Sequence, residues 1–175
     1  SDWFDIARGV SGCVDEKPDD IRVIGASTGS VVLILTASVA VAGLFAVLSK
    51  NVATVVKNVY EIRNTQEDFR HKKFMNKALE EALQSALNEQ KSGAEGVVLD
   101  AIRKFLDKQL PEEMVGQLKL AIKRFFDFTE KGGKVEILPP APNEGDDTPA
   151  ADLLGQISSL VEETRKIKSD TELLK

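Results

Sequence analysis

The chain contains a stretch of 27 consecutive residues, Val23 to Ser49, without a charged side chain. About 20 apolar residues are enough for a helix to cross the hydrocarbon core of a bilayer, and Gly29 to Ser49 supplies that length. Such a stretch either spans a membrane or lies in the core of a folded domain. The choice between these two outcomes decides the class of protein.

The residues that flank the stretch agree with a membrane span. Acidic residues precede it, and basic residues follow it: Lys50, Lys57, Arg63, Arg70, Lys72 and Lys73. The positive-inside tendency would then place the C-terminal part in the cytoplasm. This interpretation predicts a single-pass or membrane-inserting protein with residues 29–49 in the bilayer and a cytoplasmic helical module.

The composition of the stretch favours a second interpretation. Residues 21–26 resemble a strand, Ser27 to Ser30 a turn, and Val31 to Thr36 a second, β-branched strand. Ser38 is a good N-cap for a helix that continues with apolar residues at three-and-four spacing to Ile62. We favour this β-hairpin leading into a long helix, and the state of Val31 to Thr36 discriminates between the two interpretations.

The remaining segments read as mainly helical. Residues 1–12 predict a short amphipathic helix, and residues 65–91 predict a helix that either extends the preceding one into a rod of about fifty residues or follows a kink near Asn64. After Ser92-Gly93, residues 94–106 and a helix opened by Pro111 form an expected antiparallel pair. That last helix should stop at Lys131-Gly132-Gly133, before a short strand at Val135 to Leu138 that can pair with the hairpin.

The C-terminal segment has the pattern that suggests a function. Residues 139–150 are rich in proline and acidic residues and predict a flexible linker. Beyond it, residues recur at alternating steps of four and three, as in a heptad repeat. A helix of this length needs a packed face, supplied by its own chain or by another copy. The expected partner-binding residues are Leu153, Ile157, Leu160, Ile167 and Leu174.

Composition limits the functions that are open to the chain. A net charge of −5 opposes general nucleic-acid binding, and the acidic N-terminus does not resemble a signal peptide. Cys13 is the only cysteine, which fits a reducing compartment. One histidine and one cysteine supply no recognisable metal site, and Gly25 and Gly29 fit neither phosphate-binding fingerprint. We therefore expect no cofactor.

One short string bears on catalysis. The residues Val23-Ile24-Gly25-Ala26-Ser27-Thr28-Gly29 resemble a stretch of the chemotaxis methylesterases. That resemblance implies a nucleophilic role for Ser27 in a serine, histidine and aspartate triad on a parallel α/β sheet. The only histidine, His71, lies in a basic cluster, where neighbouring cations make it a poorer base. The sequence therefore predicts that the protein is not an enzyme.

These observations predict an α+β, predominantly α-helical fold. It has an N-terminal β-hairpin and a short C-terminal strand packed on a long helix and a helical pair, with a tethered C-terminal amphipathic helix. The expected units are a mainly helical domain (1–138), the linker (139–150) and the heptad-patterned helix (151–175). The expected function is non-enzymatic self-assembly or binding of another helical protein. The location is cytoplasmic, or membrane-associated if residues 29–49 enter a bilayer.

Overall fold

The computed structural model describes residues 2–27, 32–36, 38–138 and 148–174. The helices are α1 (Asp2–Gly12), α2 (Val39–His71), α3 (Lys77–Leu106), α4 (Glu112–Glu130) and α5 (Thr148–Glu172), with a 3-10 turn, η1, at Pro18–Asp20. The strands are β1 (Arg22–Ser27), β2 (Val32–Thr36) and β3 (Lys134–Leu138). The prediction of a predominantly helical chain is confirmed.

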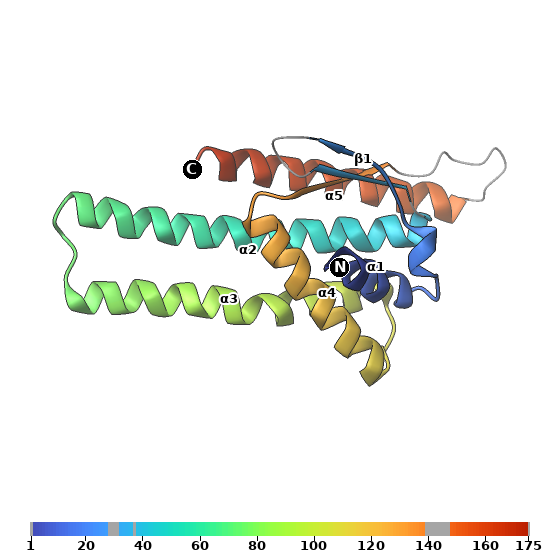
Figure 1. The fold of residues 1–175 in the computed structure, drawn as a ribbon, viewed down its shortest axis with the longest axis horizontal. Helices are drawn as coiled ribbons and strands as arrows, with labels where there is room; N and C mark the ends of the chain where they lie inside the picture. The colour runs from blue at the N-terminus through green and yellow to red at the C-terminus, as the bar shows by residue number, and fades with distance from the viewer. Residues whose placement is uncertain (1, 28–31, 37, 139–147, 175) are drawn as a thin grey trace.

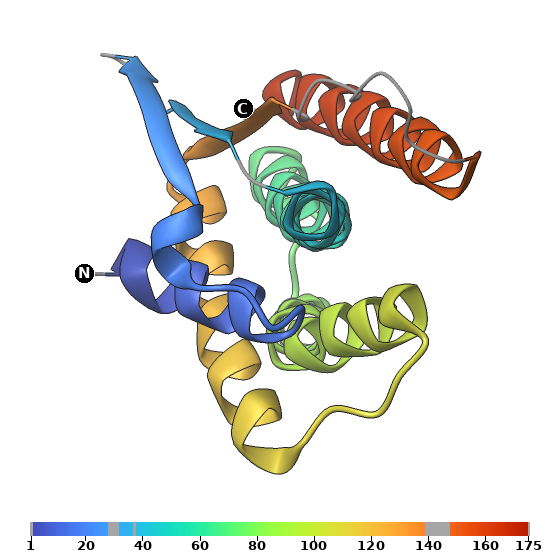
Figure 2. The ribbon, with the colours of Figure 1, turned by 90° about the vertical axis from the view of Figure 1, so that its right-hand side faces the viewer.

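The long helix α2 is the centre of the molecule. Viewed end-on in Figure 2, α2 is surrounded by α3, α5, the sheet and the pair α1 and α4. Its first turns come from the uncharged stretch, and every residue from Val41 to Ser49 is buried. The side chain of Phe45 is fully buried, where its ring stacks on Trp3 and tilts against Phe125, with centroids 5.9 and 6.5 Å apart. Residues 41–49 of the apolar run are therefore buried within the protein in this structure.

The sheet has the strand order β1-β2-β3. Strands β1 and β2 pair antiparallel with an irregularity between Val23 and Gly25, and residues 28–31 between them lie outside the described residues. Strand β3 pairs parallel with β2, with Val32 opposite Lys134 and Thr36 opposite Leu138. Of the predicted segment Val31 to Thr36, residues 32–36 are therefore strand rather than helix.

Helix α2 starts where the sequence predicts and ends later. Ser38 is the N-cap, and its Oγ accepts a hydrogen bond from the Val41 amide at 3.3 Å. The predicted kink near Asn64 is wrong, because Thr65 does not cap a new helix and its hydroxyl instead donates to the Glu61 carbonyl of the same helix. The chain turns at residues 72–76, where Lys73 has a φ of 57° and Asn76 caps α3. In place of the single rod of about fifty residues that the sequence allowed, the structure has two antiparallel helices joined by this turn (Figure 1).

Two further boundaries differ from the sequence prediction. Helix α3 runs for 30 residues through Ser92-Gly93 without a break. Its residues Ala94 and Val98 are buried, and packing of this kind outweighs the penalty of about 1 kcal/mol for a mid-helix glycine. The expected antiparallel pairing of residues 94–106 with the next helix is only partial, because α4 contacts α1 more extensively than α3.

The end of α4 and the start of α5 agree more closely with the sequence prediction. Helix α4 ends at Glu130, and Gly132 has a φ of 90° that glycine adopts without strain. The predicted linker 139–150 is shortened, because Thr148 to Ala150 already belong to α5. Pro149 suits this position, since proline is accepted in the first turn of a helix. Residues 139–147 lie outside the described residues.

Candidate functional site: the α5 docking surface

Helix α5 lies along α2, on the opposite side from α3 (Figure 1). Among the described side chains of α5, Ile157 is the most deeply buried: it is 1% exposed and packs in a small cluster with Ala42 and Ala46. Leu160 packs against this cluster and also against the main core. The small side chains of α2 let α5 approach closely, so the heptad positions face the chain's own central helix.

Two threonines occupy buried positions on the same heptad-patterned face of α5, which we call the seam. Thr164 is 6% exposed and Thr171 is 8% exposed. Each hydroxyl donates a hydrogen bond of 2.7 Å to the carbonyl four residues earlier, of Leu160 and Ile167 respectively. A buried hydroxyl that is paired in this way avoids most of the penalty of an unsatisfied polar group. The threonines are thus accommodated, although they add little apolar area.

Charged side chains line the margin of the interface. Lys50 pairs with Glu163 at 2.5 Å, Lys57 with Asp170 at 3.8 Å, and Lys134 of β3 with Glu172 at 3.9 Å. The Asn64 side-chain amide donates to the carbonyl of Leu174 at the far end. Each exposed ion pair contributes only about 0–1 kcal/mol. They set the register of α5 on α2 more than they strengthen the contact.

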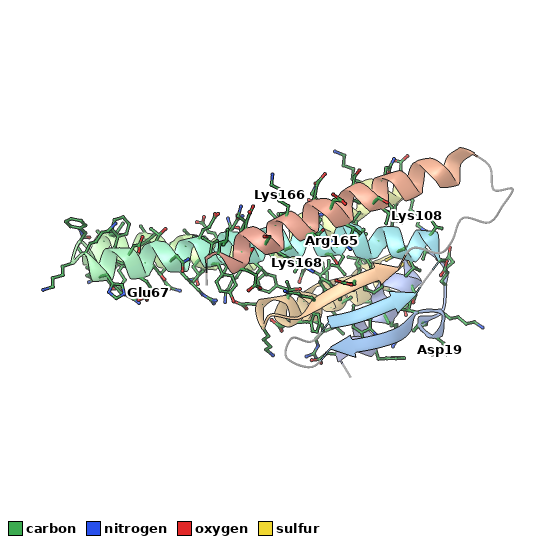
Figure 3. All side chains as sticks on the ribbon, turned by 90° about the horizontal axis from the view of Figure 1, so that it is seen from above. Asp19, Glu67, Lys108, Arg165, Lys166 and Lys168 are labelled. Carbon is green, nitrogen blue, oxygen red and sulfur yellow. The ribbon has the colours of Figure 1, made fainter. Side chains whose placement is uncertain are left out.

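A cavity of about 310 Å³ lies where α5 faces α2 and β3. Its polar walls come from Ser49 of α2, Lys134 and Glu136 of β3, and Arg165 and Lys168 of α5. Figure 3 shows Arg165 and Lys168 on the side of α5 that faces the sheet, whereas Lys166 points away from it. A second, smaller cavity adjoins residues Lys134, Lys168 and Glu172 as well. Lys168 therefore lies at the middle of this region.

The surroundings of Lys168 change its protonation. Burial, and after it the positive charge of Lys134, lower the pKa of its ammonium group from 10.5 to about 8, although Glu136 acts in the opposite direction. A desolvated ammonium near a second cation is easier to deprotonate. Sequence reasoning missed Lys168, although its position four residues after Thr164 and three before Thr171 places it on the seam side of the helix.

The predicted partner-binding residues have different environments. Ile157 is buried, and Leu160, Ile167 and Leu174 are half-buried. The side chain of Leu153 falls outside the described part of the structure. Because α5 lies on α2 of its own chain, the described seam residues are occupied within one molecule.

The candidate residues for chemistry lie elsewhere. Ser27 is the last residue of β1, and His71 is the exposed last residue of α2. Cys13 is fully buried, with its thiol donating to the Gly9 carbonyl, and burial raises the pKa of that thiol to about 11. Within residues 2–27, 32–36, 38–138 and 148–174, no group of three or more His, Cys, Asp or Glu is placed to hold a metal ion.

Comparison with known proteins gives no match. No family model, no curated protein and no solved structure is similar to this chain.

Proposed function

We propose that this protein is a non-enzymatic self-associating protein, in which α5 of one copy docks on α2 of a second copy. The observation that carries this proposal is that the fully buried part of the α5 contact lies outside the main core. Ile157 packs with Ala42 and Ala46 in a cluster of its own, whereas the buried residues of the main core come from α1, α2, α3, α4, β3 and the segments beside them, and α5 reaches that core through the half-buried Leu160. Release of α5 would leave that main core in place.

The chemistry of the interface supports exchange. Beside Ile157, Leu160 and Val161, the described interface consists of a small-residue stripe, two threonines and a margin of solvent-accessible ion pairs. Buried apolar area stabilises an interface by about 25 cal/mol per Å², and alanine and threonine supply little of it. Helix α5 should therefore be among the first elements to detach in local opening.

The chain connection permits docking in trans. Nine residues, 139–147, join β3 to α5, and an extended segment of that length reaches about 30 Å. A second copy offers an identical α2 surface, so exchange of α5 creates no contact that the single chain lacks. Exchange of one element between identical chains is a low-cost route to a dimer. A different helical protein that covers α2 is the competing partner.

Mass measurement at several concentrations tests the proposal. Size-exclusion chromatography with light scattering of the intact chain should show a mass that rises from monomer to dimer as concentration increases. Ile157→Asp places a charge in the buried cluster and should abolish the dimer. Ser158→Asp is the matched control, because Ser158 is exposed on the same helix. A monomeric mass at every concentration would refute self-association.

A second candidate function rests on the hydropathy of α2. This helix has 33 residues and contains an 18-residue window with a mean hydropathy of 1.9, which satisfies the length and composition of a membrane span. In the present fold 72% of that window is buried by the protein itself. Insertion would require α2 to leave these contacts. Fractionation of cells that express the unmodified chain separates the two candidates, since a membrane-inserted chain stays in the pellet until detergent is added.

A further inference from the structure

The cavity between α2, β3 and α5 has the size of a small-ligand site. Its volume of about 310 Å³ lies at the lower end of the range of about 300–1,000 Å³ that ligand pockets occupy. Val135 and Val161 supply apolar wall, and the polar groups converge from three different elements. A few convergent polar groups in an apolar concavity are typical of a binding site.

The charges that face the cavity are unevenly matched. The cations are Lys134, Arg165 and Lys168, and the carboxylates are Glu136 and Glu172. Glu172 pairs with Lys134 at 3.9 Å. The ion pairs between described residues include none within 4.0 Å that joins a carboxylate to Arg165 or Lys168. Glu136 offsets part of the charge of Lys168, which leaves three cations against two carboxylates in the cavity. This net positive charge attracts an anion.

A separate observation comes from α2. The side chain of Ser49 lines the cavity and is 5% exposed, yet its hydroxyl has no hydrogen-bond partner among the described residues. Buried hydroxyl groups are nearly always paired, and a serine hydroxyl can donate to an acceptor oxygen. The hydroxyl of Thr164 already donates within α5, whereas the buried Ser49 hydroxyl is free to donate to a ligand.

We propose that this cavity binds a compact oxyanion, held by the Arg165 guanidinium, the Lys168 ammonium and the Ser49 hydroxyl. Charge-assisted hydrogen bonds to an oxyanion are the strong ones, and a guanidinium can make two of them in parallel. The ligand is either free phosphate or the phosphate group of a small monoester. The two sources share this headgroup chemistry and differ in whether an organic part contacts the apolar wall.

Binding in this cavity would also bridge α5 to the remainder of the chain. Arg165 and Lys168 belong to α5, whereas Ser49 belongs to α2. A ligand that binds only when α5 is docked stabilises the docked state by mass action. The anion site does not depend on self-association, because all three groups already meet within one chain.

Calorimetric titration with inorganic phosphate, at constant ionic strength maintained with chloride, tests the proposal on the intact protein. Saturable binding is expected, and Lys168→Gln and Arg165→Gln should each weaken it at least about tenfold. Lys166→Gln removes the same charge from the opposite side of α5 and should leave affinity unchanged (Figure 3). Glycerol 3-phosphate in a parallel titration identifies the source: tighter binding than phosphate indicates a monoester, and equal binding indicates free phosphate.

Two outcomes would overturn the proposal. One is the absence of saturable binding of both probes to the unmodified protein at constant ionic strength. The other is an equal loss in Lys166→Gln and Lys168→Gln, which would mean that only net charge matters. Circular dichroism of each variant verifies that α5 remains helical, and Ser49→Ala gives an uncharged check, since it removes the hydroxyl without changing the electrostatic attraction.

Discussion

Gly9 of α1 lies directly against Ala121 of α4, so that a Cβ atom on Gly9 would be 2.6 Å from the Ala121 Cβ and 2.8 Å from the Gln117 carbonyl oxygen. A backbone carbonyl cannot turn aside as a flexible side chain can. The close approach of α1 and α4 therefore depends on the absence of a side chain at position 9, and this contact positions Trp3 over the core residue Phe45.

Gly9→Ala should accordingly destabilise the protein. Alanine normally stabilises a helix relative to glycine by about 1 kcal/mol, but here overpacking is expected to outweigh this and lower the free energy of unfolding by about 1–3 kcal/mol. Gly93→Ala in α3 is the control, because no atom lies within 4 Å of its Cβ position. Urea unfolding of both variants measures the difference. A stabilised Gly9→Ala variant would contradict the close contact.

The N-cap of α2 gives a second prediction. The Ser38 hydroxyl accepts from the Val41 amide at 3.3 Å and donates to Glu16 Oε1 at 2.5 Å. Ser38→Ala should lower the free energy of unfolding by about 1 kcal/mol, whereas Ser38→Asn, which keeps an acceptor, should retain more of the stability. Thermal unfolding of the two variants provides the comparison. Equal losses in the two variants would contradict a stabilising role for the acceptor at position 38.

Local opening of α5 can be measured with cysteine labelling. Thr171→Cys places a thiol in the buried seam, and the natural Cys13 reports on opening of the main core in the same molecule. If α5 undocks before the core opens, the thiol at position 171 should be alkylated at least about tenfold faster than Cys13 under native conditions. Mass spectrometry of the two peptides reads both rates. Equal rates would mean that α5 opens only with global unfolding.

The sequence predicted the elements better than their contacts. Ser38 and Gly132-Gly133 act through bonds to nearby backbone, so their positions alone located the start of α2 and the end of α4. The break after His71 was missed, because it depends on Lys73 adopting a left-handed conformation that no glycine announces. Ser92-Gly93 was overinterpreted, since tertiary burial of Ala94 and Val98 holds α3 together.

The candidate site was only partly predictable for the same reason. Heptad spacing placed Ile157 and Leu160 on one face, which is a local property of α5. The cavity joins Ser49, Lys134 and Lys168 from three elements that are distant in sequence. The periodicity of one segment does not predict which distant elements contact it. The lowered pKa of Lys168 therefore could not be predicted from the sequence.

The stability of the protein should depend on pH through Lys168. Its pKa is about 8 in the folded protein against 10.5 as the ordinary value, so the unfolded chain binds more protons between these two pH values. Stability therefore rises with pH across this window relative to Lys168→Met, which cannot titrate. Because solvent screens part of the charge, Lys168→Met should be about 1–2 kcal/mol more stable at pH 7. Parallel urea unfolding curves at pH 7 and pH 10 measure this. A constant difference between the two proteins would contradict the shift.

Crosslinking between two distinguishable copies tests α5 exchange most directly. One chain carries Lys50→Cys and the other Glu163→Cys, since these side chains meet at 2.5 Å between α2 and α5. If α5 docks on a second copy, a short bis-maleimide joins the two different chains when they are mixed at concentrations that give the dimer. A Lys166→Cys chain, in which the substituted side chain points away from the sheet (Figure 3), should join Lys50→Cys far less. Absence of any product between the Lys50→Cys and Glu163→Cys chains would contradict docking of α5 on a second copy.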